Sequence, residues 1–146
     1  MLAFKGIRYA RAARFARAVP EPAQGPLLRA ESFAPLCPQR PLSDHPQSED
    51  CLFLNVWTPE VDARARRAVM VYFHGGAYTT GSVTDPLTHG GKLAAQGDVV
   101  VVTVNHRLNA LGYAWLKPFG ARYADSGNLG QLDLVLALQW VRENIA

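Results

Sequence analysis

Hydrophobic and polar positions follow different patterns before and after residue 50. Residues 1–50 contain seven of the ten prolines and show no sustained periodicity, so we expect an irregular segment there. Within it, residues 4–9 are predicted to form one short strand. Residues 52–58 (Leu-Phe-Leu-Asn-Val-Trp-Thr) predict another strand, which Pro59 ends, and the polar residues 60–67 predict a turn.

Two apolar runs without alternation come next. Val69–Phe73 and residues 99–104 are rich in β-branched side chains, and an unbroken apolar run is typical of a strand buried on both faces. The segment between them is predicted to contain a helix that starts at Asp85-Pro86, with Asp as N-cap and Pro in the first helical position, and ends at Gly97. One side of this helix is expected to carry Leu87, Leu93 and Ala94.

The last predicted helix runs from Asn128 to the end of the chain, and Asn128-x-x-Gln131 is typical of a capping box. Its apolar positions form one stripe with further residues beside it: Leu129, Leu132, Leu136 and Trp140, then Leu138, Val141 and Ile145. The helical pattern is unbroken at Ala146, so the sequence predicts a truncated chain. The order strand, helix, strand, helix predicts an α/β fold with parallel strands and right-handed crossovers.

The composition is typical of one globular domain. The 146 residues have a mass of 16.0 kDa, with 49% hydrophobic and 18% charged residues, which excludes a disordered, collagen-like or disulfide-dense chain. The longest apolar runs fall far short of the roughly 18 residues that a membrane helix needs, so no membrane partner is expected. Lys5 and Arg8 interrupt the position of a signal-peptide core, which favours a cytoplasmic location.

Positive charge gathers near the N-terminus. The net charge of +3 is by itself weak support for a nucleic-acid partner. Arginine recurs at every third position, with no acidic residue before Glu21: Arg8, Arg11, Arg14 and Arg17. This spacing is compatible with a mitochondrial transit peptide, a basic nucleic-acid arm or a solvated surface loop.

The two cysteines, Cys37 and Cys51, flank a loop of 13 residues, 38–50. A disulfide closing this loop would stabilise the fold by about 3 kcal/mol in the chain-entropy model. Two free thiols are equally compatible with the sequence, because the redox compartment is unknown. A zinc site is not predicted, since two cysteines need histidine partners and His45 has no second ligand at metal spacing.

The sharpest candidate for chemistry is the segment His74-Gly75-Gly76-Ala77-Tyr78, directly after the predicted strand Val69–Phe73. Small residues at the carboxyl end of a strand let backbone N–H groups turn toward a ligand without a Cβ in the way. In acyl-transfer enzymes such a turn binds the developing oxyanion, and each donor contributes about 2.7–4 kcal/mol to the transition state. A tight turn whose glycines only supply positive φ explains the same residues, so both interpretations stay open.

Several blocks of the sequence, in the same order, resemble the type-B carboxylesterase family of the α/β-hydrolase fold, which includes the cholinesterases and bacterial p-nitrobenzyl esterases. The blocks are residues 4–10 (Phe-Lys-Gly-Ile-Arg-Tyr-Ala), 48–57 (Ser-Glu-Asp-Cys-Leu-Phe-Leu-Asn-Val-Trp), 69–76 (Val-Met-Val-Tyr-Phe-His-Gly-Gly), 99–108 (Val-Val-Val-Val-Thr-Val-Asn-His-Arg-Leu), 127–133 (Gly-Asn-Leu-Gly-Gln-Leu-Asp) and 137–145 (Ala-Leu-Gln-Trp-Val-Arg-Glu-Asn-Ile). The resemblance implies that residues 1–146 form the N-terminal portion of an α/β-hydrolase domain, with a mixed sheet whose central strands are parallel.

The resemblance also implies that the catalytic triad is missing. The family's Gly-x-Ser-x-Gly nucleophile elbow would begin shortly after Ile145, and its serine would lie about 15 residues past the end of the chain, with the acid and histidine later still. None of the serines present lies in such a motif: Ser32, Ser43, Ser48, Ser82 and Ser126. The chain is therefore expected to be truncated before the nucleophile elbow and inactive on its own.

The activity implied for the full-length protein is hydrolysis of small-molecule carboxylic esters. Gly75, Gly76 and Ala77 would form its backbone oxyanion hole, and the resemblance implies no metal or organic cofactor and no nucleic-acid partner. Two alternatives stay open: an esterase-like binding or adhesion protein without a triad, and a truncated product without a function of its own. The intact Gly-Gly-Ala turn favours the enzyme.

Two ion pairs follow from the resemblance. Arg107 and Asp133 match a structural pair near the floor of the active site. Arg14 and Glu49 match a second pair that anchors the loop between the cysteines, and the same loop implies that the two cysteines lie within about 7 Å at Cα. It also places the N-terminal arginines after a strand and in a surface loop.

The last predictions concern the four histidines. His74 is expected to position the oxyanion turn rather than to act as a general base. His106, where the family usually has Tyr, is expected to pack near the end of a strand. His45 and His89 are expected to be exposed. A further departure is residues 10–13, which lack the family's Pro-Pro-x-Gly.

Overall fold

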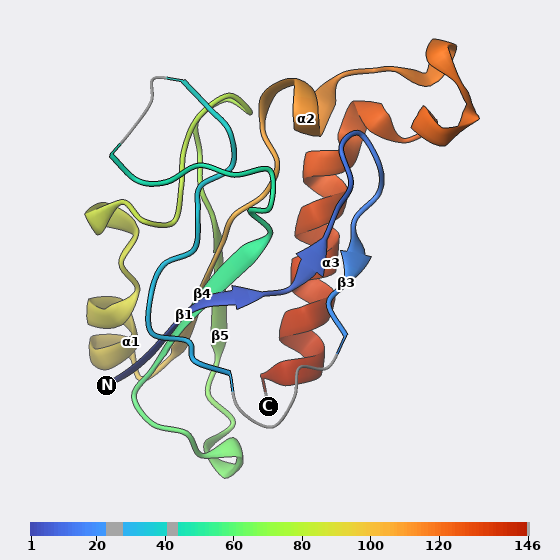
Figure 1. Ribbon diagram of the computed structural model, residues 1–146. Coiled ribbons are helices and arrows are strands. Elements are labelled where there is room, and N and C mark those ends of the chain that lie inside the picture. The colour runs from blue at the N-terminus through green and yellow to red at the C-terminus, as the bar shows by residue number, and fades with distance from the viewer. Residues whose placement is uncertain (23–27, 41–43, 146) are drawn as a thin grey trace.

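The computed structural model describes residues 1–22, 28–40 and 44–145 (Figure 1). Ser43 and the prolines at positions 26 and 41 lie outside these residues. The strands are β1 (Leu2–Arg8), β2 (Ala10–Arg11), β3 (Val19–Pro20), β4 (Phe53–Thr58), β5 (Val69–Phe73) and β6 (Val100–Val104). The α-helices are α1 (Gly91–Gly97), α2 (Asn109–Tyr113) and α3 (Leu129–Asn144), and 3₁₀ turns cover Ala63–Ala65, Pro86–Thr88, Lys117–Phe119, Ala121–Tyr123 and Ser126–Asn128.

The main sheet has the strand order β1-β4-β6-β5, and β2 pairs with β3 in a separate two-stranded ribbon. β1 is antiparallel to β4, and β4 is antiparallel to β6. β5 and β6 are parallel, with Val71 opposite Val102. The predicted α/β class and the mixed sheet with parallel strands are therefore confirmed, as are the strands expected near residues 4–9 and 52–58.

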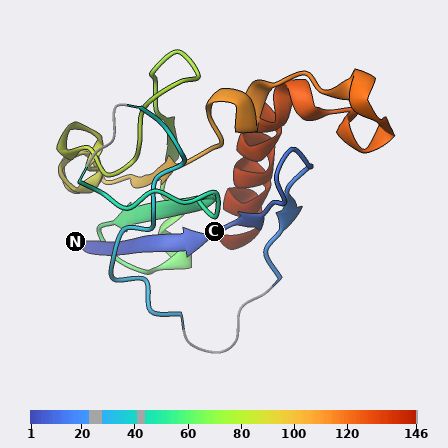
Figure 2. The same cartoon turned by 45° about the horizontal axis from the view of Figure 1, so that its top comes forward.

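Helices lie on both faces of this sheet. α3 runs along one face and α1 lies on the opposite side (Figures 1 and 2). The larger core cluster joins α3, through Ala137 and Val141, to the sheet residues Leu54 and Val102. A smaller cluster on the other face joins Trp57 and Val101 to Ala94 of α1. This layering puts the carboxyl ends of β5 and β6 side by side at one end of the sheet.

The two apolar runs differ in burial. Every residue of β6 is buried, as expected. The prediction that Val69–Phe73 is buried on both faces is wrong, because Met70 and Tyr72 are 48% and 43% exposed. β5 is the end strand of the described sheet, and α1 contacts β4 and β6 on that face. Only the alternate side chains of β5, including Val71, pack on the larger core.

The first predicted helix is split. Asp85 does cap the segment, since the N–H of Leu87 donates to its Oδ1 at 2.8 Å, but the capped element is a single 3₁₀ turn and α1 starts only at Gly91. The helix begins where glycine permits close approach to the sheet: a Cβ on Gly90 would lie 2.8 Å from the Trp57 ring. Two residues expected on the inner side, Leu87 and Leu93, are exposed, while Ala94 is fully buried as expected.

α3 departs from the predicted last helix at both ends. Asn128 makes no side-chain cap bond, so the predicted capping box is wrong, and a 3₁₀ turn precedes the helix. The helix ends at Asn144, and Ile145 is extended. The first residue of the predicted apolar stripe, Leu129, is buried. The remaining buried residues are shifted by one position toward the C-terminus relative to that stripe: Gly130, Asp133, Ala137 and Val141. Leu138 is exposed.

Residues 1–50 are held by side chains more than by regular structure. Each of the four N-terminal arginines forms an ion pair with an acidic side chain: Arg8 with Asp50, Arg11 with Glu21, Arg14 with Glu49 and Arg17 with Asp125. These pairs favour a surface segment anchored to the domain, as the family resemblance implied, over a free basic arm that binds nucleic acid. The Arg14–Glu49 pair is confirmed.

Candidate active site

Strand β5 delivers the Gly-Gly-Ala turn to the carboxyl end of the sheet. After Gly75 the backbone is left-handed, with φ of +120° at Gly76, +51° at Ala77 and +65° at Tyr78. The N–H groups of Thr79 and Thr80 both donate to the Gly76 carbonyl, at 3.0 and 3.1 Å. A Cβ on Gly76 would lie 2.1 Å from the Thr80 carbonyl oxygen, so this position requires glycine.

The turn leaves two neighbouring backbone donors free. Within the described residues, neither the Gly76 nor the Ala77 nitrogen donates a hydrogen bond to the protein, and both residues are exposed. The turn lines a pocket of about 350 Å³ together with Phe73, His74, Tyr78, His106, Leu108, Gln131 and Leu134. Adjacent N–H groups beside such a pocket can bind an anionic oxygen. Gly75, Gly76 and Ala77, the predicted site residues, therefore lie together on one turn beside one pocket.

His74 and His106 form a stacked pair behind this turn. Their ring centroids are 4.5 Å apart with an interplanar angle of 15°, and both side chains are buried. His74 Nδ1 lies 2.9 Å from the Gly75 carbonyl, and His106 Nδ1 lies 3.2 Å from the Arg107 carbonyl. Burial lowers the pKa of both imidazoles, although the backbone hydrogen bonds oppose this shift. Both rings are therefore neutral at pH 7, and His106 packs at the end of β6 as predicted.

A buried ion pair fixes the segment after β6. Arg107 donates from Nε and Nη2 to the two carboxylate oxygens of Asp133, at 2.9 and 2.7 Å, and its backbone N–H donates to the same carboxylate at 3.1 Å. Nη1 donates to the Ala16 carbonyl at 2.7 Å. This confirms the predicted pair and ties α3, the N-terminal segment and the end of β6 together.

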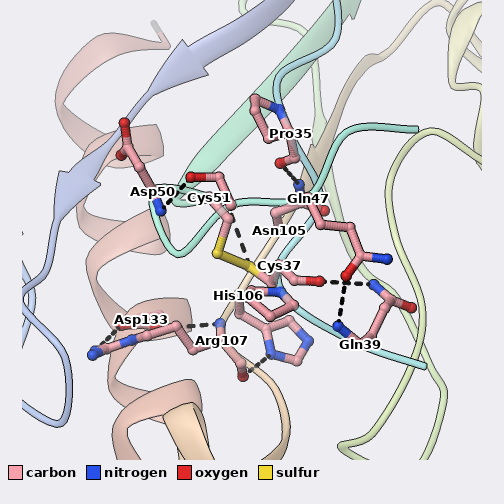
Figure 3. The surroundings of a disulfide bond; sticks show 12 residues. Pro35, Cys37, Gln39, Gln47, Asp50, Cys51, Asn105, His106, Arg107 and Asp133 are labelled. Atoms are coloured by element: carbon pink, nitrogen blue, oxygen red, sulfur yellow. Dashed lines mark hydrogen bonds and ion pairs between the residues drawn. A yellow bond between two sulfur atoms is a disulfide. The ribbon is translucent and has the colours of Figure 1, made fainter. Parts of the chain in front are cut away.

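The cysteine loop reaches the same region (Figure 3). Cys37 and Cys51 form a disulfide with a Cα–Cα distance of 5.0 Å, which decides between the two alternatives that the sequence left open. Gln39 accepts a hydrogen bond from the Gly81 N–H and donates to the Gly81 carbonyl, both at 2.8 Å, and it also donates to the Cys37 carbonyl. Sequence reasoning missed this contact between Gln39 and Gly81, because nothing local links positions 42 residues apart.

Other candidate side chains lie elsewhere. None of the described serines lines the pocket that holds the turn. His45 and His89 are exposed as expected, with ring contacts to Phe33 and Trp57 respectively. The described part of the chain contains no group of three or more His, Cys, Asp or Glu side chains that could hold a metal ion. In the same residues, no helix has the length and apolar character required to cross a membrane.

Comparison with known proteins shows extensive similarity to esterases. The chain is 42% identical to the para-nitrobenzyl esterase of Bacillus subtilis over 98% of its own length. Over 68% of its length it is 55% identical to human carboxylesterase 3. Among solved structures, a carboxylesterase of Geobacillus stearothermophilus matches 98% of the chain with a TM-score of 0.91 and 45% identity. An esterase of Clostridium hathewayi, described as hydrolysing aliphatic aromatic polyesters, matches 98% with a TM-score of 0.92 and 47% identity.

These relatives are longer proteins. The chain spans 31% of the length of the B. subtilis esterase and 30% of the Geobacillus carboxylesterase chain. The sequence pattern of the carboxylesterase family nevertheless matches all of residues 1–146. The chain, with its α/β-hydrolase sheet and glycine-rich turn, belongs to the carboxylesterase family.

Proposed function

We propose that this chain is the N-terminal part of a serine carboxylic-ester hydrolase and contributes the oxyanion-binding turn. The serine, the acid and the histidine of the triad are supplied by residues that follow position 146. Family membership supports the ester-hydrolase chemistry, and the chain's share of its relatives' length leaves room for the rest of the machinery. The observation that carries the proposal is the pair of unbonded N–H groups at Gly76 and Ala77, beside a pocket.

In this mechanism the serine attacks the acyl carbon of a small-molecule ester and forms an acyl-enzyme. The carbonyl oxygen becomes an oxyanion and accepts hydrogen bonds from Gly76 and Ala77, while Gly75 shapes the turn. Because the donors are backbone groups of a turn closed by Thr79 and Thr80, they do not have to reorganise as charge develops. His74 and His106 are not required as bases, since the triad histidine supplies the base in this proposal.

The decisive experiment replaces one donor in an active esterase that carries these residues. Gly76→Pro removes the N–H and is expected to lower kcat at least about 100-fold on p-nitrophenyl acetate. Gly97→Ala is the control, because Gly97 does not line the pocket, a Cβ there meets only Val99 at 3.5 Å and its backbone is not left-handed. We expect that variant to keep kcat within about threefold of the parent. Unchanged kcat in a folded Gly76→Pro variant would refute the proposal.

The 146-residue chain itself gives an independent test. Without a nucleophile and base, an oxyanion turn supports only weak residual catalysis. We therefore expect the purified chain to hydrolyse p-nitrophenyl acetate no faster than a matched protein blank. Saturable turnover that survives removal of trace host esterases would contradict the assignment of the triad to other residues.

A further inference from the structure

The hydrogen bond between His74 Nδ1 and the Gly75 carbonyl orients the backbone of the turn as well as the imidazole ring. A carbonyl oxygen only accepts, so His74 Nδ1, at 2.9 Å, must carry the proton. The Gly75 carbonyl and the Gly76 N–H belong to one planar trans peptide and point in opposite directions. Holding that carbonyl therefore fixes the direction of the Gly76 N–H. The side chain that fixes the donor is therefore His74.

Gly81 shows how closely this bond is enclosed. A Cβ on Gly81 would lie 2.3 Å from the Gly75 carbonyl oxygen and 2.3 Å from His74 Nδ1. The backbone of Gly81 thus passes directly over the hydrogen bond, and Gln39 holds it there through bonds to both its N–H and its carbonyl. One side of the His74–Gly75 bond is closed by the chain itself.

The His74 ring has His106 as its stacking partner. The rings stack at 4.5 Å, and His106 is itself fixed, because its Nδ1 lies 3.2 Å from the Arg107 carbonyl. Arg107 is anchored in turn by the buried carboxylate of Asp133. A continuous set of contacts therefore runs from α3 to the turn after β5, and His106 is the only ring stacked on His74 among the described residues.

We propose that His106 is a positioning residue for the oxyanion turn: its ring holds His74 in the orientation in which Nδ1–H binds the Gly75 carbonyl and directs the Gly76 N–H into the pocket. The catalytic part of this proposal rests on the proposed function of the turn. The structural part, that the His106 ring holds His74 in place, does not. His106 takes no part in proton transfer. An aromatic ring of similar size is sufficient at this position, whereas a small side chain is not.

The first test is spectroscopic and uses the 146-residue chain. In a two-bond ¹H–¹⁵N correlation of histidine side chains at pH 7.5, His74 is expected as the neutral Nδ1–H tautomer. An Nε2–H tautomer at His74 would overturn the proposal without any variant, because the bond that orients the Gly75–Gly76 peptide would not exist.

The second test compares two replacements of the same ring. His106→Ala is expected to lower the ¹⁵N order parameter of the Gly76 amide from about 0.85 to below about 0.6, and His106→Phe is expected to preserve it. His89→Ala is the matched control, because it removes an exposed imidazole that contacts Trp57 and does not line the pocket beside the turn. Amide signals of β6 report whether each variant is folded. An unchanged order parameter in folded His106→Ala, or a lowered one in His106→Phe, would refute the proposal.

Kinetics in an active esterase carrying these residues separate this proposal from the proposed function. If both hold, His106→Ala lowers kcat about tenfold, with little change in KM, and His106→Phe restores it. If Gly76→Pro leaves kcat unchanged, the proposed function fails, while the tautomer and order-parameter results still decide the role of His106. If Gly76→Pro abolishes activity but His106→Ala matches the parent, only the positioning role fails.

Discussion

The ends of the two parallel strands β5 and β6 lie side by side but are built in opposite ways. After β5, Gly75, Gly76 and Ala77 are exposed, and their N–H groups donate no hydrogen bond to the described residues. After β6, residues 105–108 are buried, and Arg107 meets its carboxylate with three donors. The turn's own bonds, from the N–H groups of Thr79 and Thr80, hold the Gly76 carbonyl. The Gly75 carbonyl is held instead by His74, and the stacked histidines are where the two segments meet.

The comparison of the two strand ends predicts that the free energy of unfolding depends mainly on the buried segment after β6. Arg107→Ala leaves the buried Asp133 carboxylate without its guanidinium, so the free energy of unfolding should fall by about 3–5 kcal/mol. Arg17→Ala is the matched control, because the Arg17–Asp125 pair is exposed and screened by solvent and should contribute far less. Urea denaturation of both variants measures the difference. Equal losses would show that the buried pair is not what holds this segment.

The disulfide should have the next largest effect. Its cysteines are 14 residues apart, so replacing both by serine should lower the free energy of unfolding by about 3 kcal/mol. Gln39→Ala sharpens the comparison, because it removes the two bonds to Gly81 and keeps the disulfide. We expect Gln39→Ala to loosen the turn with a smaller loss of stability, as measured by urea denaturation and by the Gly76 order parameter. If the variant with both cysteines replaced by serine were as stable as the parent, the loop would be held by its ion pairs alone.

Much of this arrangement follows from local sequence. The apolar runs predict β4, β5 and β6, because short runs rich in β-branched and aromatic side chains, bounded by turn residues, favour strands. The motif after β5 predicts the turn, because only glycine tolerates the backbone of Gly76. The Arg107–Asp133 pair is predicted from the family resemblance rather than from spacing.

The remainder depends on contacts that a local pattern does not contain. The exposure of Met70 and Tyr72 depends on which strand ends the sheet. The start of α1 is set by the approach of Gly90 to Trp57, not by the better capping signal at Asp85. The roles of Gln39 and of the His74–His106 stack require segments more than 30 residues apart to meet, and no periodicity marks such a meeting.

Acid should lower the free energy of unfolding through the stacked histidines, where the segments after β5 and β6 meet. Burial lowers the pKa of His74 and His106, so below the ordinary histidine pKa of about 6.5 the unfolded chain binds protons that the folded chain does not. The free energy of unfolding should therefore fall as the pH drops from 7 toward 5 because of this pair, and level off once the folded rings also protonate. Above pH 7 both states are neutral, and the pair should cause no pH dependence.

His106→Phe isolates this contribution, because it keeps an aromatic ring against His74 and removes one titrating group from the stack. Its free energy of unfolding, measured by urea denaturation at half-unit steps from pH 7.5 to 5, should fall less steeply than that of the parent. The acidic partners of the N-terminal arginines do not mimic the effect, since the Arg hydrogen bonds lower the carboxyl pKa values of Glu49 and Asp50 and move their titration further below pH 5. If His106→Phe and the parent lost stability equally between pH 7 and pH 5, the stacked rings would not be neutral partners, and the buried segment would not be what keeps the open turn in place.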